Sequence, residues 1–260
     1  MSQLIKKIPI IATFIDNTSY QDACDRIEDW VDQQKSCYVV AANVHVVMMS
    51  YWQKSYRKIL NQAALVTPDG MPLVWEMRIL GIKQQTRVYG PDLMLSWCDR
   101  AAQKNIPIYL YGGTNETLAK LQINLKEQFP NLVIAGVHSP PFRELTKTEE
   151  VENRQRIQAS GAKVVFVGLG CPKQEQWMAR QKDQLAAVMI GVGAAFRFHS
   201  GEVSQAPRWV MKLGLEWLYR FGCEPQRLWQ RYLINNPLFI GLLLWQLGST
   251  FWQERMNISN

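Results

Sequence analysis

The sequence predicts an α/β fold: a Rossmann-like, mostly parallel sheet with helices on both faces, followed by a helical, membrane-associating C-terminal appendage. Three observations lead to this class. Short, continuously apolar runs alternate with amphipathic helical patterns from residue 36 to residue 193. The apolar runs do not alternate with polar residues, which is typical of strands covered on both faces. After about residue 200 only helical patterns remain, so the alternating β and α rhythm of the fold ends there.

The expected strands and helices follow one another along the chain. The strands are expected at 36–43, 63–70, 106–113, 131–137, 162–170 and 186–193. The helices are expected at 44–62, 71–80, 91–104, 115–129, 149–160 and 173–185. The N-terminal stretch "MSQLIKKIPIIATFID" favours a strand over a signal peptide, because it lacks a small-residue cleavage site.

We predict two parts: an α/β catalytic domain at 1–200 and a helical appendage at 201–260 that docks on the membrane and completes the active site. The appendage concentrates charge and aromatic rings. Five of the ten tryptophans follow residue 205. Between residues 205 and 235 the basic side chains outnumber the acidic ones, and the basic ones are Arg208, Lys212, Arg220, Arg227 and Arg231.

The run "PLFIGLLLWQL" at 237–247 is almost uncharged. Its eleven residues are short for a membrane span, so we interpret it as lying on a membrane surface. The alternative is a helix packed on the protein's own core or on a second subunit. The net charge of +7 suits nucleic acid, anionic lipid or phosphorylated small molecules and does not choose among them.

Metal and disulfide chemistry find no support in the sequence. The five cysteines are scattered without a CxxC pair, which favours a reducing compartment. The three histidines are isolated, and no Asp-x-Asp motif occurs. We therefore expect no metal and no cofactor, and any phosphate would have to be held by arginines and helix N-termini.

In open parallel sheets, ligands bind beyond the carboxyl ends of the strands. Asp69 follows a strand in "VTPDGMP", where it is either a turn or capping carboxylate or a general base. Gly112 and Gly113 precede a helix in "YGGTNET". They offer backbone N–H groups to an anion or simply form a turn capped by Thr114 or Asn115.

Two further loops, "GLGCPKQEQW" and "GVGAAF", contain GxG without completing GxGxxG. NAD binding is therefore disfavoured. Gln174 and Glu175 open a helix, where they are either surface residues of its first turn or ligand contacts.

Together these motifs resemble the WecG/TagA/CpsF family, glycosyltransferase family 26. The stretches that carry the resemblance are "TPDGMPLVW", "GCPKQEQWM", "GVGAAF", "APRWVMKLGLEWLYR" and "EPQRLWQRYL". The resemblance implies an inverting, metal-independent enzyme that moves a sugar, often N-acetylmannosamine, from UDP to a lipid-diphosphate-linked sugar in the synthesis of cell-surface polysaccharides. It also implies peripheral attachment to the inner face of the cytoplasmic membrane.

The resemblance also implies roles for individual residues. Asp69 matches the proposed base, and Arg220 and Arg227 match appendage arginines thought to contact the diphosphate. We expect catalysis from Asp69, Gln174, Arg220 and Arg227. We expect substrate contacts from Asn43, Gly70, Gly112, Gly113, Lys173, Glu175, Arg197 and Arg231. Arg231 lies four residues after Arg227, so the two share one helix face.

Three positions depart from the family pattern. Ala41 replaces a threonine, Gln205 replaces an arginine, and Arg197 replaces an acidic residue. An acid-to-base change near the nucleotide leads to the hypothesis that the donor sugar is not N-acetylmannosamine, or that the nucleotide is held differently.

Two other functions compete with the enzyme. A nucleic-acid-binding protein would use the basic, aromatic appendage, but it leaves Asp69 and the glycine-rich loops without a role. A non-catalytic scaffold of a polysaccharide-assembly complex is disfavoured by the intact "TPDG" and "PKQE" motifs. A homo-oligomer is compatible with either function.

Overall fold

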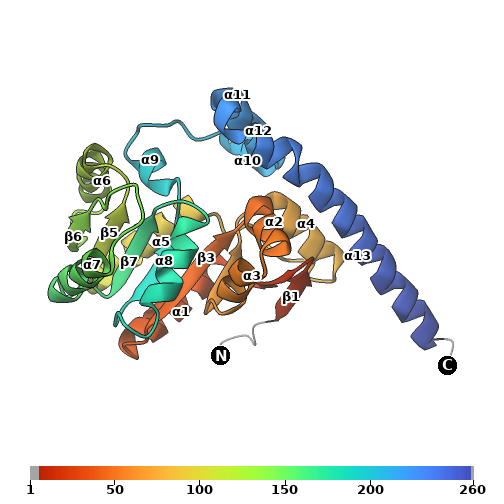
Figure 1. Ribbon diagram of the computed structural model, residues 1–260, viewed down its shortest axis with the longest axis horizontal. Coiled ribbons are helices and arrows are strands. Elements are labelled where there is room, and N and C mark those ends of the chain that lie inside the picture. The colour runs from red at the N-terminus through yellow and green to blue at the C-terminus, as the bar shows by residue number, and fades with distance from the viewer. Residues whose placement is uncertain (1–5, 259–260) are drawn as a thin grey trace.

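A computed structural model describes residues 6–258 of the chain, with side chains described as far as residue 249. Its centre is a six-stranded parallel sheet in the order β4-β3-β8-β7-β5-β6. The strands are β3 (Cys37–Ala42), β4 (Leu65–Pro68), β5 (Ile108–Gly112), β6 (Ile134–His138), β7 (Val164–Gly168) and β8 (Val188–Gly191). The predicted fold class is confirmed, and each of the six strands expected in this region is present (Figure 1).

Helices cover both faces of this sheet, because side chains of a buried strand point alternately to opposite sides. Tyr38 and Val40 of β3 enter one core cluster, whereas Cys37 and Val39 enter the other. The helices that precede residue 200 are α1 (Tyr20–Asp32), α2 (Val44–Trp52), α3 (Lys54–Asn61), α4 (Met71–Ile79), α5 (Gly90–Lys104), α6 (Asn115–Gln128), α7 (Lys147–Ala159), α8 (Lys173–Gln181) and α9 (Ala195–His199).

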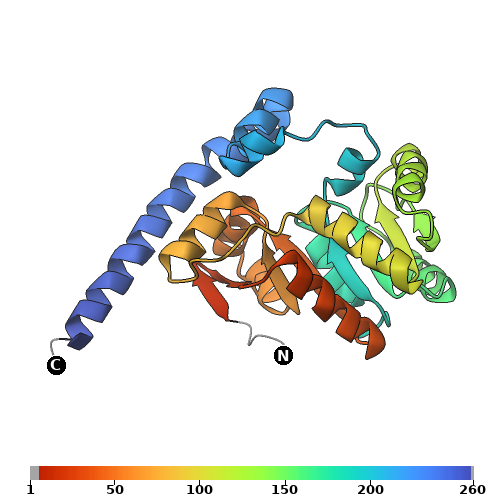
Figure 2. The ribbon, with the colours of Figure 1, turned by 180° about the vertical axis from the view of Figure 1, so that it is seen from behind.

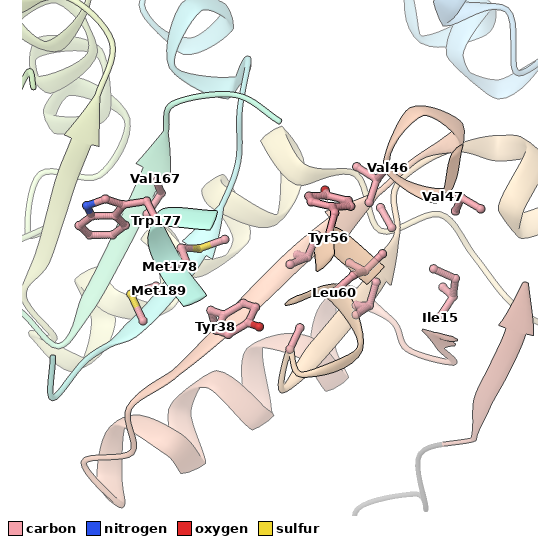
Figure 3. Close-up of a cluster of buried hydrophobic side chains, with 14 of the residues drawn as sticks. Ile15, Tyr38, Val46, Val47, Tyr56, Leu60, Val167, Trp177, Met178 and Met189 are labelled. Carbon is pink, nitrogen blue, oxygen red and sulfur yellow. The ribbon is translucent and has the colours of Figure 1, made fainter. Parts of the chain in front are cut away.

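The first core cluster fills the space between the sheet and helices α2, α3 and α8. Figure 3 shows Tyr38 from β3 near Leu60 and Tyr56 from α3, with Trp177 and Met178 from α8 farther along the sheet. All five side chains are at least 98% buried. These aromatic and branched side chains therefore hold α3 and α8 against the sheet.

The N-terminal stretch forms a two-stranded antiparallel hairpin of β1 (Lys7–Ile10) and β2 (Thr13–Asp16). The expected strand is thus present as two short ones, joined by a turn in which Ile11 has a φ of 54°. The Asp16 carboxylate accepts a hydrogen bond of 2.7 Å from the Val66 N–H of β4. Helix α1, which sequence reasoning did not anticipate, follows the hairpin.

The helix expected at 44–62 is divided at Gln53 into α2 and α3. Gln53 has an extended backbone, with φ −121° and ψ 106°. Arg57 of α3 donates hydrogen bonds to the carbonyls of Ser50 and Tyr51 at the end of α2. The break lets both short helices place a buried face on the first core cluster, which explains why an uninterrupted helix was the wrong prediction.

The appendage contains α10 (Arg208–Lys212), α11 (Glu216–Cys223), α12 (Pro225–Leu233) and α13 (Asn235–Ile258). Figures 1 and 2 show α10–α12 above α2 and the adjoining end of β3, with the long α13 running down past α4 and β1. Helix α13 packs on the body through Phe239, which is 2% exposed. Gln246 of α13 also accepts a hydrogen bond from the Ile11 N–H and donates one to the Pro9 carbonyl.

One side of α13 therefore packs on the protein's own core, as expected in the alternative interpretation of the 237–247 run. The other side is exposed: Ile240, Leu244 and Trp245 are 55–75% accessible. Within the described residues, none of the helices combines the length and apolar composition that crossing a bilayer demands. The predicted boundary at residue 200 lies in the segment between α9 and α10. The division of the chain into two domains stays a prediction.

Candidate active site

A cavity of about 570 Å³ lies between residues that follow the carboxyl ends of β3, β4, β7 and β8 and residues of the appendage. Its walls come from the loops after these strands and from helices α4, α11, α12 and α13. Seven of the predicted site residues line it: Asn43, Asp69, Gly70, Gln174, Arg220, Arg227 and Arg231. The topology explains this grouping, because parallel strands end at one edge of the sheet.

Asp69 is held at this edge by its backbone and by its side chain. Its N–H and that of Gly70 donate to the Ala42 carbonyl at the end of β3. Its carboxylate accepts hydrogen bonds from the Gly90 N–H at 3.0 Å and from the Asn43 amide at 3.3 Å. Gly70, and not Asp69, is the N-cap of α4. Asp69 is therefore no helix cap, and it lines the cavity.

The pKa of Asp69 is raised above its ordinary value. Burial of the carboxyl is the main cause, and the Glu216 carboxylate adds to it. The Arg87 guanidinium opposes both effects, with its Nη2 4.0 Å from Asp69 Oδ1. A carboxylate with a raised pKa is a stronger proton acceptor than an exposed aspartate, which suits a general base.

Asn43 joins three parts of the site. Its Oδ1 caps α2 by accepting hydrogen bonds from the N–H groups of His45 and Val46. Its amide donates to Asp69, and Oδ1 also accepts a contact of 3.4 Å from Arg231. Gly70 lies so close that a Cβ on it would be 3.3 Å from the Asn43 backbone. A side chain at position 70 would thus separate Asn43 from the neighbouring strand end.

Arg87, Tyr89 and Glu216 connect the appendage to Asp69. Glu216 of α11 accepts hydrogen bonds from Arg87 at 2.6 Å and from the Tyr89 hydroxyl at 3.0 Å. The Arg87 guanidinium lies over the Tyr89 ring, with its Cζ 4.1 Å from the ring centroid. It also donates a hydrogen bond to the Asp69 backbone carbonyl. The appendage and the predicted base are therefore linked by one charge-assisted chain of contacts.

Three arginines of the appendage, Arg220, Arg227 and Arg231, line the cavity and differ in their partners. Arg227 is paired with Glu224 at 2.9 Å. Arg220 lies over the Phe198 ring at 5.7 Å and makes no ion pair with any carboxylate that the structure describes. Arg231 also has no acidic partner among the described side chains, and its buried Nε has no hydrogen-bond acceptor. Two guanidiniums are thus available to an anion.

Gln174 connects the loop after β7 with the loop after β8. Its side-chain oxygen accepts hydrogen bonds from the N–H groups of Gly170 and Gly193, at 3.2 and 3.0 Å. Its amide donates to Glu175 at 2.8 Å. Glu175 is fully buried beside Gln174, burial raises its pKa, and it does not line the cavity. Gln174 therefore holds together the two loops, one after β7 and one after β8, that form this part of the cavity wall.

Four predicted substrate contacts also lie outside the lining of the cavity: Gly112, Gly113, Lys173 and Arg197. Gly112 approaches Gly168 so closely that a Cβ would lie 2.7 Å from its backbone. Lys173 donates to the Phe142 carbonyl. Arg197 pairs with Glu224 at 3.3 Å. Gly112 is thus packed against a neighbouring strand, and Lys173 and Arg197 have other partners, while substrate contacts by the four residues stay a prediction.

Other lining residues were missed by sequence reasoning. They include His45, Trp75, Glu76, Arg87, Tyr89 and Glu216. Burial and the nearby Arg231 lower the pKa of His45 to about 4, so it is neutral at pH 7. The motif "TRVYGPD" at the start of α5 combined charge, aromatic ring and glycine before a helix, and it is the signal that would have found Arg87 and Tyr89. In the part of the chain that the structure describes, no three acidic, histidine or cysteine side chains gather as a metal site requires.

The model of the Glycosyl transferase WecG/TagA/CpsF family matches residues 8–251. The chain belongs to this family. It is a glycosyltransferase, and the resemblance seen in its motifs is confirmed. Membership also favours the enzyme over the nucleic-acid-binding protein and the scaffold.

This glycosyltransferase is similar to three proteins that share one name, N-acetylglucosaminyldiphosphoundecaprenol N-acetyl-beta-D-mannosaminyltransferase. The one from Bacillus spizizenii is 32% identical over 83% of this chain and 81% of its own. The one from Bacillus subtilis is 28% identical over 89% and 87%. The one from Staphylococcus aureus (strain NCTC 8325 / PS 47) is 29% identical over 90% and 91%.

Proposed function

We propose that this glycosyltransferase moves an N-acetylmannosamine-like sugar from UDP to a polyprenyl-diphosphate-linked sugar, with inversion and without a metal. The observation that carries the proposal is one cavity that holds a buried carboxylate, Asp69, and two guanidiniums, Arg220 and Arg231, that have no acidic partner among the described residues. The names of the relatives support the acceptor class, since they specify a sugar on diphosphoundecaprenol.

The proposed reaction is a single displacement. The acceptor hydroxyl oxygen bonds to the anomeric carbon and its proton passes to Asp69. The bond from that carbon to the diphosphate breaks, and its electron pair leaves on UDP. An attack from the side opposite the leaving group inverts the anomeric configuration. Asp69 serves as general base, and the positive charge of the arginines stabilises the charge that develops on the diphosphate.

Arg231 supports an anion site on energetic grounds. Burial lowers its pKa, because a cation removed from water without a partner is unfavourable. Arg220 also lines the cavity and adds like charge, which lowers the pKa of Arg231 further. A diphosphate between the two would offset this cost through charge-assisted hydrogen bonds.

The donor proposed first is UDP-N-acetylmannosamine. Arg197, whose acid-to-base change had suggested another donor, pairs with Glu224 outside the lining of the cavity. The change therefore gives no structural reason for a different sugar, and the relatives are named as mannosaminyltransferases.

A panel of UDP-sugars tests the proposed function. We expect UDP release with one donor, in EDTA, only when a GlcNAc-diphosphate-lipid acceptor is present. Folded protein that releases UDP from no donor, or only after a divalent cation is added, contradicts the proposal. A different best donor leaves the reaction class standing and replaces only the sugar.

Replacing Arg231 with glutamine is expected to lower kcat/KM about a hundredfold, because one charged donor to the leaving diphosphate is lost. The melting temperature is expected to stay the same or rise, since a buried cation that has no acidic partner among the described side chains is removed. Steady-state kinetics and thermal unfolding measure the two effects. Arg180→Gln is the control, because Arg180 is exposed and pairs with Glu150 at 2.9 Å. Equal kinetic losses in both variants would contradict a role for Arg231 in diphosphate binding.

We also propose that the appendage rests on the cytoplasmic face of the membrane. Its helices and the turns between them expose many large apolar side chains: Trp209, Leu213, Leu215, Leu218, Trp229, Leu233, Ile234, Ile240, Leu244 and Trp245. A belt of this kind with arginines nearby suits an interfacial position on anionic lipid.

The double variant Leu244→Gln, Trp245→Gln is expected to bind anionic vesicles about tenfold more weakly, because two apolar side chains leave the bilayer boundary. Co-sedimentation measures this binding. Phe142→Gln is the matched control, since Phe142 is 78% exposed on the catalytic part. A control that lost as much binding as the appendage variant would contradict docking through α13.

A further inference from the structure

The cavity has a second, apolar part between α4 and α13. Trp75 and Ile79 of α4 line it on one side, and Phe239, Ile240 and Leu243 of α13 line it on the other. Figures 1 and 2 show how α13 passes α4 on its way from the appendage to the hairpin. These five apolar side chains form what we call the α4–α13 groove.

The walls of the α4–α13 groove are only partly covered by protein. Trp75, Ile79 and Ile240 line the cavity and yet are 43%, 57% and 55% exposed. Phe239, by contrast, is buried and packs with Leu243 on the first core cluster. Exposed apolar walls over a packed apolar floor are typical of a site that gains stability when an apolar ligand covers it.

The α4–α13 groove is continuous with the arginines of the active site, because all of these residues line one cavity. Trp75 also contacts the appendage: a Cβ on Gly214 would lie 2.5 Å from its indole ring. One end of the cavity thus offers guanidiniums that have no acidic partner among the described residues. The other end is mostly apolar, with Glu76 of α4 and Asn236 of α13 as its polar lining residues. A ligand that fits both ends carries a strongly anionic head joined directly to an apolar chain.

We infer that the α4–α13 groove binds the first isoprene units of the acceptor's polyprenyl chain, so that the enzyme recognises the lipid itself as well as its sugar diphosphate. The inference rests on the proposed function, which supplies the acceptor. It makes Ile79 and Ile240 specificity residues for the lipid, separate from the residues that act on the sugar and the diphosphate.

The test compares two soluble acceptors, GlcNAc diphosphate esterified with a farnesyl chain or with a methyl group, in the absence of vesicles. Wild type is expected to use the farnesyl acceptor with a kcat/KM at least about a hundredfold higher, because burial of isoprene carbons is favourable. Ile79→Gln and Ile240→Gln are each expected to lose about tenfold on the farnesyl acceptor and nothing on the methyl one.

Leu244→Gln is the matched control for Ile240→Gln. Both side chains are exposed on α13, at 65% and 55%, but only Ile240 lines the cavity. Leu244→Gln is expected to leave both acceptors unaffected when no membrane is present. Thermal unfolding of each variant separates a lost contact from a lost fold.

Four results would overturn the inference. Equal use of both acceptors by wild type would show that the chain is not recognised. Equal losses on both acceptors in Ile79→Gln and Ile240→Gln would place these residues in a general structural role. Turnover of neither acceptor with any UDP-sugar would remove the proposed function, and the inference with it. Turnover of the methyl acceptor alone keeps the proposed function while rejecting the groove.

Discussion

The variant Asp69→Asn is expected to lower kcat about a thousandfold while leaving the fold intact. A general base contributes a factor of this order, and an amide cannot take the acceptor's proton. Asparagine has nearly the same shape, and its side-chain oxygen keeps an acceptor for the Gly90 N–H. Turnover, circular dichroism and UDP binding measure the three properties. Loss of UDP binding together with turnover would indicate a binding role for Asp69 and contradict its role as base.

The pH dependence of kcat/KM also tests the role of Asp69 as the general base. The pKa of Asp69 is raised, mainly by burial. The base form is lost as the pH falls through that raised pKa, so the acid limb of kcat/KM should lie at a higher pH than for an exposed aspartate. The limb should disappear in Asp69→Asn, measured on its residual activity. An unchanged limb in the variant would assign the titration to another group.

Glu76→Gln is expected to stabilise the protein by about 3 kcal/mol at pH 7. Glu76 lies on α4, is fully buried, and neither carboxyl oxygen has a hydrogen-bond partner among the described residues. Burial raises its pKa from 4.5 to about 8. The unfolded chain therefore releases this proton near pH 4.5, whereas the folded protein retains it until about pH 8.

Stability should consequently fall as the pH rises from about 4.5 to about 8, because the folded protein binds the extra proton in that window. Glutamine does not titrate, so the gain in unfolding free energy should be small at pH 5 and largest at pH 8. Denaturant unfolding at both values measures it. Glu127→Gln, at an exposed position on α6, is the control. A gain that does not change with pH would mean that Glu76 is not the titrating group.

The sheet could be predicted because its strands are encoded locally. Each buried strand is a short apolar run between helical patterns, and "VVFVG" of β7 shows this directly. The break at Gln53 could not be predicted in the same way. It depends on where α2 and α3 meet the core and on contacts from Arg57 to the α2 carbonyls, which are tertiary features.

The active site was predictable where its residues follow strands. Asn43, Asp69 and Gln174 lie at strand ends that a parallel sheet brings together. Arg220, Arg227 and Arg231 came from the family resemblance and the charge pattern of the appendage. Their shared cavity also depends on how α11 and α12 fold back over the sheet.

The pairing of Arg87 with Glu216 could not be predicted, because the two residues are 129 positions apart and local sequence does not show which charged side chains meet. The glycines of "YGGTNET" left two alternatives open, anion binding and a turn, and the first stays a prediction. In the structure Gly112 lies where β5 passes close to Gly168, a tertiary contact that the local sequence does not show. Local sequence does not distinguish a glycine required by strand packing from one required by a ligand.

The central claim is that Asp69 and the appendage arginines together transfer one sugar with inversion. The most direct test is the structure of the product formed from UDP-N-acetylmannosamine and a GlcNAc-diphosphate-lipid acceptor in EDTA. We expect mass spectrometry to find the acceptor heavier by one N-acetylhexosamine, and NMR to find the new linkage in the β configuration. An acceptor of unchanged mass with every UDP-sugar, or a product that retains the α configuration of the donor, would contradict transfer with inversion.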